Sequence, residues 1–415
     1  MTSFNINSLI PHRREDWMLL SVILNSLINI SGVRSNALPY VLMIISVIIF
    51  FYILLKYCRR VPLTGITGKC YSLMIVWTII LTLHMFLFAE SASFSYYFAS
   101  NTFFPYLLPL LIMCFPRDYR IDLKYYWRIQ WIFCIIFIIL FPFAIRKVMA
   151  YGAIVQSMGM DGSNVGEYYQ EMISAHAFAV LAPCTIMIYF KDYLRHKKWY
   201  LYIIATVCLL FLMAYSGRRG NTAIYILYFA FIFIVNFYSN KITLRSLILW
   251  CSIILGLYYV VSGSLDSTFS ILRDRAYIDS RSKVEDAFFA DFNSIQDWLF
   301  GRGWMGAYFD RDFGKNRELV ETGYLNLLLH GGLLLLVPYV VILFNSFRLG
   351  LFKSKNVLCK GFAVMCVMQL ISLYPYGLPT FSVLHYTIWI GVFVCNSQYY
   401  RNLTDQEIFK LGIVG

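Results

Sequence analysis

The chain has 415 residues, of which 60% are hydrophobic and only 14% are charged, and its mean hydropathy is +0.64. Soluble domains carry about 25% charged residues, so this composition excludes an ordinary water-soluble globule, and the apolar content excludes a disordered chain. The net charge of +13 indicates either a nucleic-acid surface or the excess of Lys and Arg that membrane proteins keep on their cytoplasmic side.

Long apolar runs predict an all-α, polytopic membrane protein that forms one integral membrane domain over residues 1–415. A transmembrane helix takes about 20 apolar residues, and the chain supplies about twelve such runs. Arg13 and Arg14 precede the first run, which has the pattern of an uncleaved signal anchor. The predicted spans are 17–33, 38–57, 71–89, 102–116, 126–145, 172–190, 199–216, 222–238, 244–263, 322–345, 357–374 and 380–398.

The basic residues indicate an orientation. If the spans alternate from a cytoplasmic N-terminus, both termini are cytoplasmic and 22 of the 35 Lys and Arg residues lie in cytoplasmic segments. Of the other 13, 8 fall in one long outer loop, 264–321, and long loops contribute little to the charge rule. The positive charge is therefore explained by topology, and we expect the bilayer and not a nucleic acid as partner.

The outer loop 264–321, between the ninth and tenth spans, is predicted to be helical. Asp279 or Ser280 can cap a helix through SKVEDAFFADF, and Asn293 or Ser294 can cap a second, SIQDWLF, that ends at Gly301. The aromatic residues of these helices give them apolar faces, which we expect to lie against the membrane domain or its outer surface.

No cofactor or metal site is predicted. The ten cysteines lie in apolar runs or predicted cytoplasmic loops and none has CxxC spacing, which supports neither a disulfide framework nor a zinc site. No phosphate-binding loop, serine-hydrolase motif or zinc-protease motif occurs with a supporting context.

Arg218 and Arg219 stand in a very short outer turn, SGRRG, where the insertion rule disfavours positive charge. One interpretation is that both side chains extend to lipid headgroups. The other is an anion site, because the arginine fork matches phosphate or pyrophosphate.

A second candidate region, WLFGRGWMGAYFDRDFGKNRELVETGYLNLLLHGG, joins the outer loop to the tenth span. Glycines around Arg302 allow close backbone approach to an anion, and Arg317 adds positive charge. Glu321 is either a carboxylate at a helix start or a general base. His330 lies about 13 Å further along that helix, and a structural hydrogen-bonding role is the alternative to substrate binding.

A third candidate is LRDRAYIDSRSK in the outer loop. Arg273, Arg275 and Arg281 can bind saccharide or phosphate. The alternative is a solvated loop of mixed charge.

The chain resembles the Wzy-type O-antigen and capsule polymerases and the related WaaL-type O-antigen ligases, in its many spans, cytoplasmic ends and one large late outer loop. Tyr324, Leu325, Leu328 and Gly332 match the spacing of the ligase-like pattern that ends the loop. Glu321 and Thr322 stand where that pattern has His and Asn. Trp298, Gly301 and Gly303 resemble the W-x-x-G-x-G feature of the family, and Arg218 or Arg219 stands where such enzymes place an outer arginine.

This resemblance implies a GT-C-like, metal-independent glycosyltransferase of the bacterial inner membrane. It would transfer a growing glycan from undecaprenyl pyrophosphate to the next lipid-linked repeat unit, with a chain-length regulator as a protein partner. Arg218, Arg219 and Arg302 would contact pyrophosphate, and Glu321 would assist the acceptor hydroxyl. The remaining candidate substrate-binding residues are Arg273, Arg275, Arg281, Arg317, Tyr324 and His330.

Three other functions remain open at this point. An O-antigen ligase would share the same chemistry. A flippase for lipid-linked oligosaccharide would show two related halves, whereas this chain has one large outer loop without a counterpart. An acyltransferase would need a reactive histidine, for which His330 is the sole candidate in the region.

Overall fold

The structure is a computed structural model, and it describes residues 10–31, 37–88, 104–117, 119–157, 177, 180–184, 199–215, 219–238, 282–311, 314–320, 322–374 and 378–411. The described chain is mostly helical, with almost no strand. It divides into two compact units, one of residues 1–28, 35–125 and 279–414 and the other mainly of residues 126–278.

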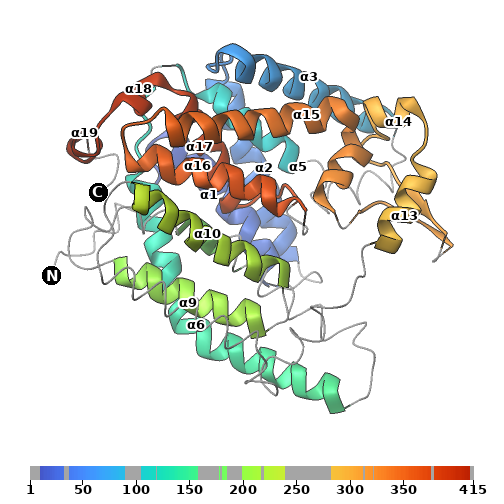
Figure 1. Cartoon of the computed structure of the whole chain (residues 1–415), viewed down its shortest axis with the longest axis horizontal. Coiled ribbons are helices and arrows are strands. Elements are labelled where there is room, and N and C mark those ends of the chain that lie inside the picture. The colour runs from blue at the N-terminus through green and yellow to red at the C-terminus, as the bar shows by residue number, and fades with distance from the viewer. Residues whose placement is uncertain are drawn as a thin grey trace. The chain divides into compact units, whose positions relative to one another are not determined.

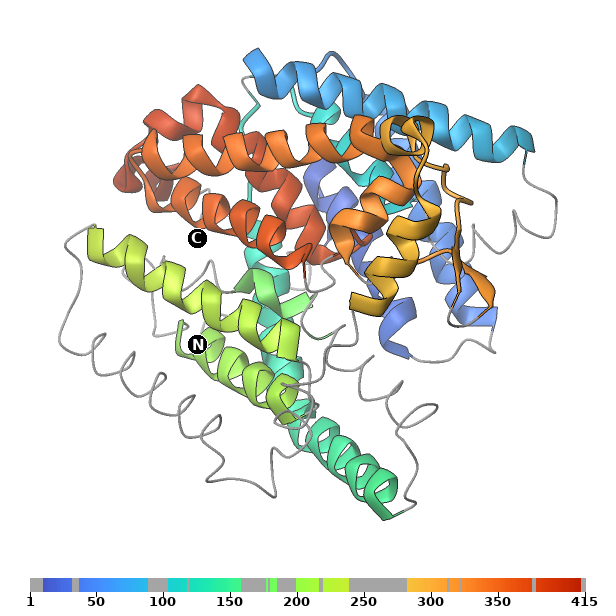
Figure 2. The ribbon, with the colours of Figure 1, turned by 45° about the vertical axis from the view of Figure 1, so that its right-hand side comes forward.

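The first unit is built around α15 (Gly323–Phe352), which packs against α3 (Gly65–Phe88), α16 (Val357–Ser372) and α17 (Val383–Asn396). Figure 1 and Figure 2 both show α3, α15 and α16 side by side. The other helices of this unit outside the outer loop are α1 (Arg14–Ser31), α2 (Ala37–Tyr57), α5 (Phe104–Leu107), the 3-10 helix η2 (Leu108–Cys114), α18 (Gln398–Asn402) and α19 (Asp405–Lys410).

The second unit contains most of α6 (Lys124–Ser157), the 3-10 helix η3 (Ala182–Cys184), α9 (Trp199–Tyr215) and α10 (Arg219–Tyr238). α9 packs against α10 and η3. Leu209, Leu212 and Met213 of α9 are fully buried, as is Tyr225 of α10. The apolar run 199–216 therefore forms the predicted helix, whereas the predicted span 244–263 and most of 172–190 lie outside the described residues.

Three described helices are long and apolar enough to cross a membrane: Gly65–Phe88, Lys124–Arg146 and Gly323–Phe352. Each coincides with a predicted span. Shorter apolar helices include Val41–Tyr57, Val357–Ser372 and Val383–Asn396, which also fall on predicted spans. The structure thus agrees with an all-α protein that has membrane-spanning helices.

The predicted span 102–116 is not one regular helix. It begins with the four-residue α5 and continues as the seven-residue η2, with prolines at positions 105 and 109. Proline removes a backbone donor, and a 3-10 helix rises about 2.0 Å per residue, so the pair reaches about 20 Å, less than the hydrocarbon thickness of about 30 Å. Leu108, Leu111 and Ile112 are nevertheless fully buried, so this segment is a packed part of the unit.

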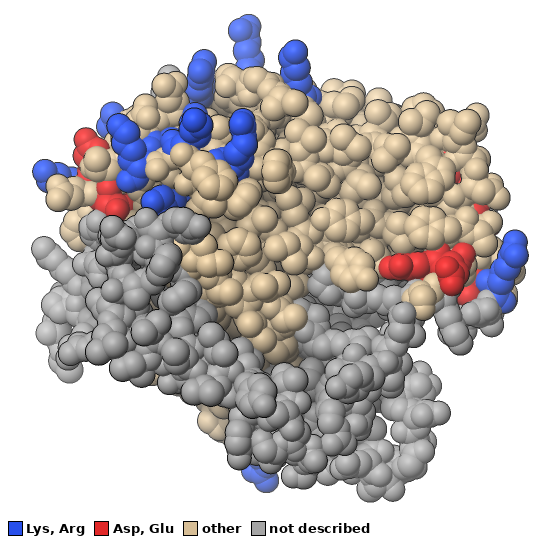
Figure 3. Space-filling view, in the orientation of Figure 1, with Lys and Arg blue, Asp and Glu red and all other residues tan. Residues whose placement is uncertain are grey.

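Helix ends that are far apart in the sequence meet at one end of the first unit. Arg14 at the start of α1 donates to Cys114 O at 2.5 Å, and the Arg59 amide, after α2, donates to Met113 O at 2.9 Å. The Lys355 amide, between α15 and α16, donates to Arg401 O at 2.9 Å. These are segments that the sequence places on the cytoplasmic side, and in Figure 3 most of the visible Lys and Arg side chains lie at one end of the surface. We refer to the end of the first unit at which Arg14, Arg59, Lys355 and Arg401 lie as the basic end.

The described part of the outer loop contains both expected helices, α13 (Ser282–Asp291) and α14 (Ile295–Phe300). Ser294 is the N-cap of α14, accepting a hydrogen bond from Asp297 N at 3.0 Å, and Gly301 ends this helix. Phe288 and Phe292 of α13 are buried in a cluster with Leu328 and Leu329 of α15. Full burial of each phenylalanine contributes about 2 kcal/mol, which holds the loop on α15.

A short antiparallel hairpin was not expected from the sequence. β1 (Tyr308–Asp310) pairs with β2 (Lys315–Arg317), with Tyr308 opposite Arg317. Strands of three residues carry too few alternating positions to be recognised as a pattern. Tyr308 is fully buried against Phe288, so the hairpin is fixed by tertiary packing.

Candidate functional site

The candidate site is organised by a break in α15. Gly332 has φ 61° and ψ −166°, a conformation that is essentially restricted to glycine. Around the break, three carbonyl oxygens accept hydrogen bonds from outside the helix. Leu329 O accepts from Arg302 N at 2.6 Å, His330 O from Gly303 N at 3.0 Å, and Gly331 O from the Trp77 indole at 2.8 Å.

Two glycines allow the outer loop to approach this break. A Cβ atom on Gly301 would lie 2.6 Å from the backbone nitrogens of Gly331 and Gly332. A Cβ atom on Gly332 would collide with the carbonyl oxygen of Leu299. Gly301, one of the glycines that the sequence suggested for close approach to an anion, therefore serves the close approach of two backbone segments.

Arg302 follows α14, and its side chain bonds to residues of both α13 and α14. Its Nε and Nη2 donate to the two carboxylate oxygens of Asp297 at 3.2 and 3.0 Å, and Nη1 donates to Asp291 Oδ2 at 2.5 Å. The other donors reach Ala307 O at 2.8 Å and Asp291 O at 2.9 Å. These bonds use all five N–H groups of the guanidinium.

This geometry makes Arg302 a positioning residue of the outer loop. The hydrogen bonds from Arg302 lower the pKa of Asp297, and that carboxylate in turn raises the pKa of Arg302. A phosphate oxygen would have to displace one of these partners to reach the guanidinium. The guanidinium is therefore occupied in this arrangement, and the expectation that Arg302 contacts pyrophosphate stays a prediction.

Trp304 anchors the next part of the loop to α3 and α5. Its ring is 1% exposed and stacks on Tyr106 at 4.4 Å between ring centroids, and its indole donates to Thr82 Oγ1 at 3.1 Å. His330 lies beside it, buried, and its Nδ1 donates to Gly303 O at 3.0 Å, since a carbonyl only accepts. This contact is the structural role that the sequence offered as the alternative to substrate binding for His330.

The start of α15 is tied to two other elements. Thr322, its N-cap residue, makes no capping bond, and its hydroxyl donates to Glu285 Oε1 of α13 at 2.5 Å. The Tyr324 hydroxyl donates to Leu370 O at 2.6 Å, in the last turn of α16, where helix carbonyls lack helical partners. The hydroxyl hydrogen of Tyr324, a residue expected to bind substrate, is therefore already donated to the carbonyl oxygen of Leu370.

Arg317, also expected to bind substrate, lies in the hairpin. Its Nη1 is 3.0 Å from Asp310 Oδ2, and the Asp310 side chain is 2% exposed. This ion pair joins β2 to β1 and partly neutralises the guanidinium.

The other predicted site residues are less fully described. Arg219 is the first residue of α10, in the second unit. Arg218, Arg273, Arg275, Arg281 and Glu321 lie outside the described residues. The structure thus brings Arg302 and His330 together through Gly303, and it places Tyr324 on the same helix as His330.

Sequence reasoning overlooked the partners of these residues. Asp291 and Asp297 stood in the expected helices without an assigned role, and Trp77 lay in an apolar run. The signal for the break was present, since Gly331 and Gly332 form a glycine pair inside an apolar run, where helix is otherwise favoured. The identity of the partners follows only from long-range contacts.

The described part of this site offers hydrogen-bonding groups and carboxylates, and Arg302 and Arg317 are already ion-paired. Within the described residues, no group of three or more His, Cys, Asp or Glu side chains is placed to hold a metal ion. The hydrogen bonds of Arg302 and Gly303 hold this described part of the outer loop against the broken helix.

Comparisons with protein-family models, with curated proteins and with solved structures gave no match. Function is therefore inferred from the residues themselves.

Proposed function

We propose that the protein is a membrane-embedded glycan polymerase with about twelve transmembrane helices in the bacterial inner membrane. In this proposal it transfers a growing glycan from undecaprenyl pyrophosphate to a lipid-linked repeat unit at the outer face, without a metal ion. Arg218 and Arg219 stabilise the pyrophosphate leaving group, and Glu321 accepts the proton of the attacking sugar hydroxyl.

The observation that carries this proposal is the docking of the outer loop on α15. Arg302 N and Gly303 N bond to the carbonyls at the break, and Phe288 and Phe292 pack against the same helix. This docking supports a fixed position for the chain on both sides of Glu321. A catalytic carboxylate needs such preorganisation, because a displacement of about 1 Å can cost a hundredfold in rate.

A flippase for lipid-linked oligosaccharide is the second candidate, because transporters often bind substrate at discontinuous membrane helices. In such sites the unwound carbonyls face a cavity and coordinate the transported species. Here the carbonyls of Leu329, His330 and Gly331 are bonded to Arg302, Gly303 and Trp77. The break in α15 therefore serves loop docking, which favours the enzyme.

The decisive experiment uses the purified full-length protein in lipid nanodiscs with an undecaprenyl-pyrophosphate-linked oligosaccharide. We expect longer lipid-linked products and free undecaprenyl pyrophosphate. Arg218→Ala, Arg219→Ala and Glu321→Gln should each reduce the rate at least about tenfold, since single charge-stabilising groups contribute about 10²–10³ in such reactions. Arg311→Ala, an exposed basic residue of the same loop, is the matched control.

The deletion phenotype separates the two candidates. Loss of a polymerase leaves single repeat units on the cell surface, whereas loss of a flippase leaves none. Full-length glycan from the Arg218→Ala, Arg219→Ala double variant would contradict the assigned arginines, and the absence of any elongation by wild-type protein would contradict the enzyme.

A further inference from the structure

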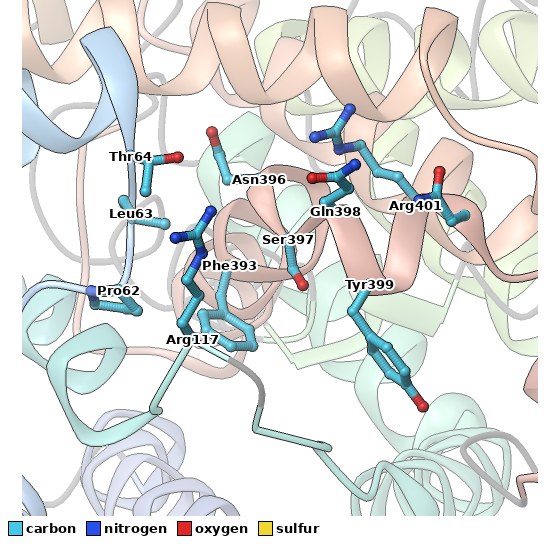
Figure 4. Close-up of a pocket in the computed structure, with 11 residues that line it drawn as sticks. Pro62, Leu63, Thr64, Arg117, Phe393, Asn396, Ser397, Gln398, Tyr399 and Arg401 are labelled. Carbon is cyan, nitrogen blue, oxygen red and sulfur yellow. The ribbon is translucent and has the colours of Figure 1, made fainter.

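A polar cavity of about 450 Å³ lies at the basic end of the first unit. It is formed by the α2–α3 connection, by the residue that follows Pro116, and by the corner between α17 and α18. Figure 4 shows the side chains of Arg117, Gln398 and Arg401 on its wall. The cavity is far in the sequence from every residue assigned to the proposed transferase site.

The cavity presents hydrogen-bond donors and positive charge. Arg117 and Arg401 supply guanidinium groups, Gln398 an amide, and Thr64 and Ser397 hydroxyls. Asn396 is different, because its amide nitrogen already donates to Ser346 Oγ and Val392 O, both at 2.8 Å. The described lining includes no acidic side chain.

The two arginines lack a compensating carboxylate within the described part of the chain. No described ion pair involves Arg117 or Arg401, and the Nε atom of Arg401 is buried without a described hydrogen-bond partner. A buried guanidinium nitrogen without a partner is costly unless an anion binds it.

Carboxylates at this end of the unit are used by the backbone instead. Asp16 accepts from the amides of His12 and Arg13, Glu15 from the amide of Asp122, and Glu407 from the amide of Thr404. Asp405 accepts from Val357 N at 2.7 Å. These bonds cap helices and loops and leave positive charge in excess around the cavity.

A second, mostly apolar hollow adjoins the polar cavity. Its volume is about 630 Å³, it shares Pro62 and Arg117 with the polar cavity, and it adds Arg59, Arg60, Val61 and Pro116. The hollow follows the C-terminal end of α2, whose Ile48 and Leu55 are 61% and 86% exposed. The lining residues Arg59 to Pro62 thus directly follow a helix that carries exposed apolar side chains.

We propose that this pair of hollows binds an anionic phospholipid, with its phosphate on Arg117 and Arg401 and its glycerol and upper acyl region against Val61, Pro62 and Pro116. Two forks of N–H donors match the oxygens of one phosphodiester. The apolar hollow and the exposed apolar face of α2 favour a membrane lipid over a water-soluble phosphate ester. Basic pockets between helices at the cytoplasmic face are a general means of binding acidic lipid headgroups.

The test measures the affinity of the purified full-length protein for dioleoyl phosphatidylglycerol by native mass spectrometry. Dioleoyl phosphatidylcholine is the zwitterionic comparison lipid, and sn-glycerol 1-phosphate is the soluble probe. We expect binding of the anionic lipid, weak binding of the zwitterionic lipid, and no competition by millimolar glycerol phosphate.

The variants are Arg117→Gln, Arg401→Gln and their combination, with Arg348→Gln as the matched control. Arg348 is exposed, bonds to Asn345, and lies outside both hollows. Each cavity variant should lose about fivefold in affinity, because one arginine near an anionic lipid contributes about that factor, and the control should change less than twofold. The melting temperature of each variant in phosphatidylcholine confirms that the variant folds. If Arg401→Gln does not fold, Arg401→Lys is used in its place.

Unchanged affinity of the folded double variant would overturn the proposal. Equal loss in Arg348→Gln would overturn it as well, because the effect would then be diffuse surface charge. Effective competition by glycerol phosphate would overturn the assignment to a lipid, since the phosphate alone would account for binding.

Discussion

Trp77 donates its indole N–H to the carbonyl oxygen of Gly331 at 2.8 Å, and this bond joins α3 to the break in α15. The two residues are 254 positions apart in the sequence. The same break receives the amides of Arg302 and Gly303 from the outer loop. One helix irregularity therefore connects α3 with the loop that the proposed function places at the outer face.

Trp77→Phe should reduce the stability of the protein by about 1–3 kcal/mol, because a carbonyl in a packed region is left without a partner. The aromatic contact with Phe300, at 5.7 Å between ring centroids, can persist with a phenylalanine. Thermal unfolding in detergent measures the loss, with Trp17→Phe at a 38% exposed position as control. Equal melting temperatures for both variants would show that the indole bond does not contribute.

Gly332→Ala should destabilise the protein by more than Gly314→Ala. Both glycines have positive φ, 61° and 60°, so both variants carry backbone strain of about 1–3 kcal/mol. A Cβ atom at Gly332 also collides with Leu299 O, whereas Gly314 has no atom within 4 Å of that position. Limited proteolysis of the outer loop reports the difference, and equal cleavage rates for the two variants would contradict the docking described above.

Arg302→Gln should remove the acid sensitivity of loop docking. Arg302 holds the pKa of Asp297 below its usual value of 3.8, so this carboxylate stabilises the fold above that value and the contribution is lost as the pH falls through the lowered pKa. Between about pH 5 and pH 3, wild-type protein should therefore lose more stability than the variant. Melting temperatures across this window provide the measurement, and parallel curves would argue against the Arg302–Asp297 contribution.

Thr322→Val should lower stability by about 1 kcal/mol, because Glu285 loses the hydroxyl that donates to it at 2.5 Å. Under the proposed function it should also lower the transfer rate, since Thr322 precedes α15 and adjoins Glu321. Thr322→Ser, which keeps the hydroxyl, should retain both properties. If Thr322→Val transfers glycan at the wild-type rate, the hydrogen bond from Thr322 to Glu285 does not contribute to catalysis.

Local properties of the chain are predicted well by the sequence. The apolar runs 71–89 and 357–374 correspond to α3 and α16. A long apolar run can be recognised from consecutive residues alone, without knowledge of distant contacts. Ser294 and Gly301 bound α14 as expected, since a cap depends on residues three or four positions away. The run 102–116 also forms an apolar helical segment, Phe104–Cys114, but it is short and partly a 3-10 helix, because two prolines favour a tighter segment.

The candidate site was less predictable, because the sequence shows which side chains can bind a ligand but not which protein groups already bind those side chains. Arg302, Arg317 and Tyr324 have side chains that suit a phosphate or a sugar, and the sequence has no means of showing that Asp291, Asp310 and Leu370 already bind them. The basic end shows the reverse case. Arg117 and Arg401 counted only as topological signals in the sequence, and folding gathers them around one cavity.

By itself, the sequence determined that this is a mostly helical chain with helices long and apolar enough to cross a membrane, because hydrophobicity and helix length depend on residues that are neighbours in the sequence. Only the tertiary structure decided which polar groups are still free to bind a ligand. That depends on contacts such as Trp77 with Gly331 and Arg302 with Leu329, between residues that become neighbours only when the helices pack.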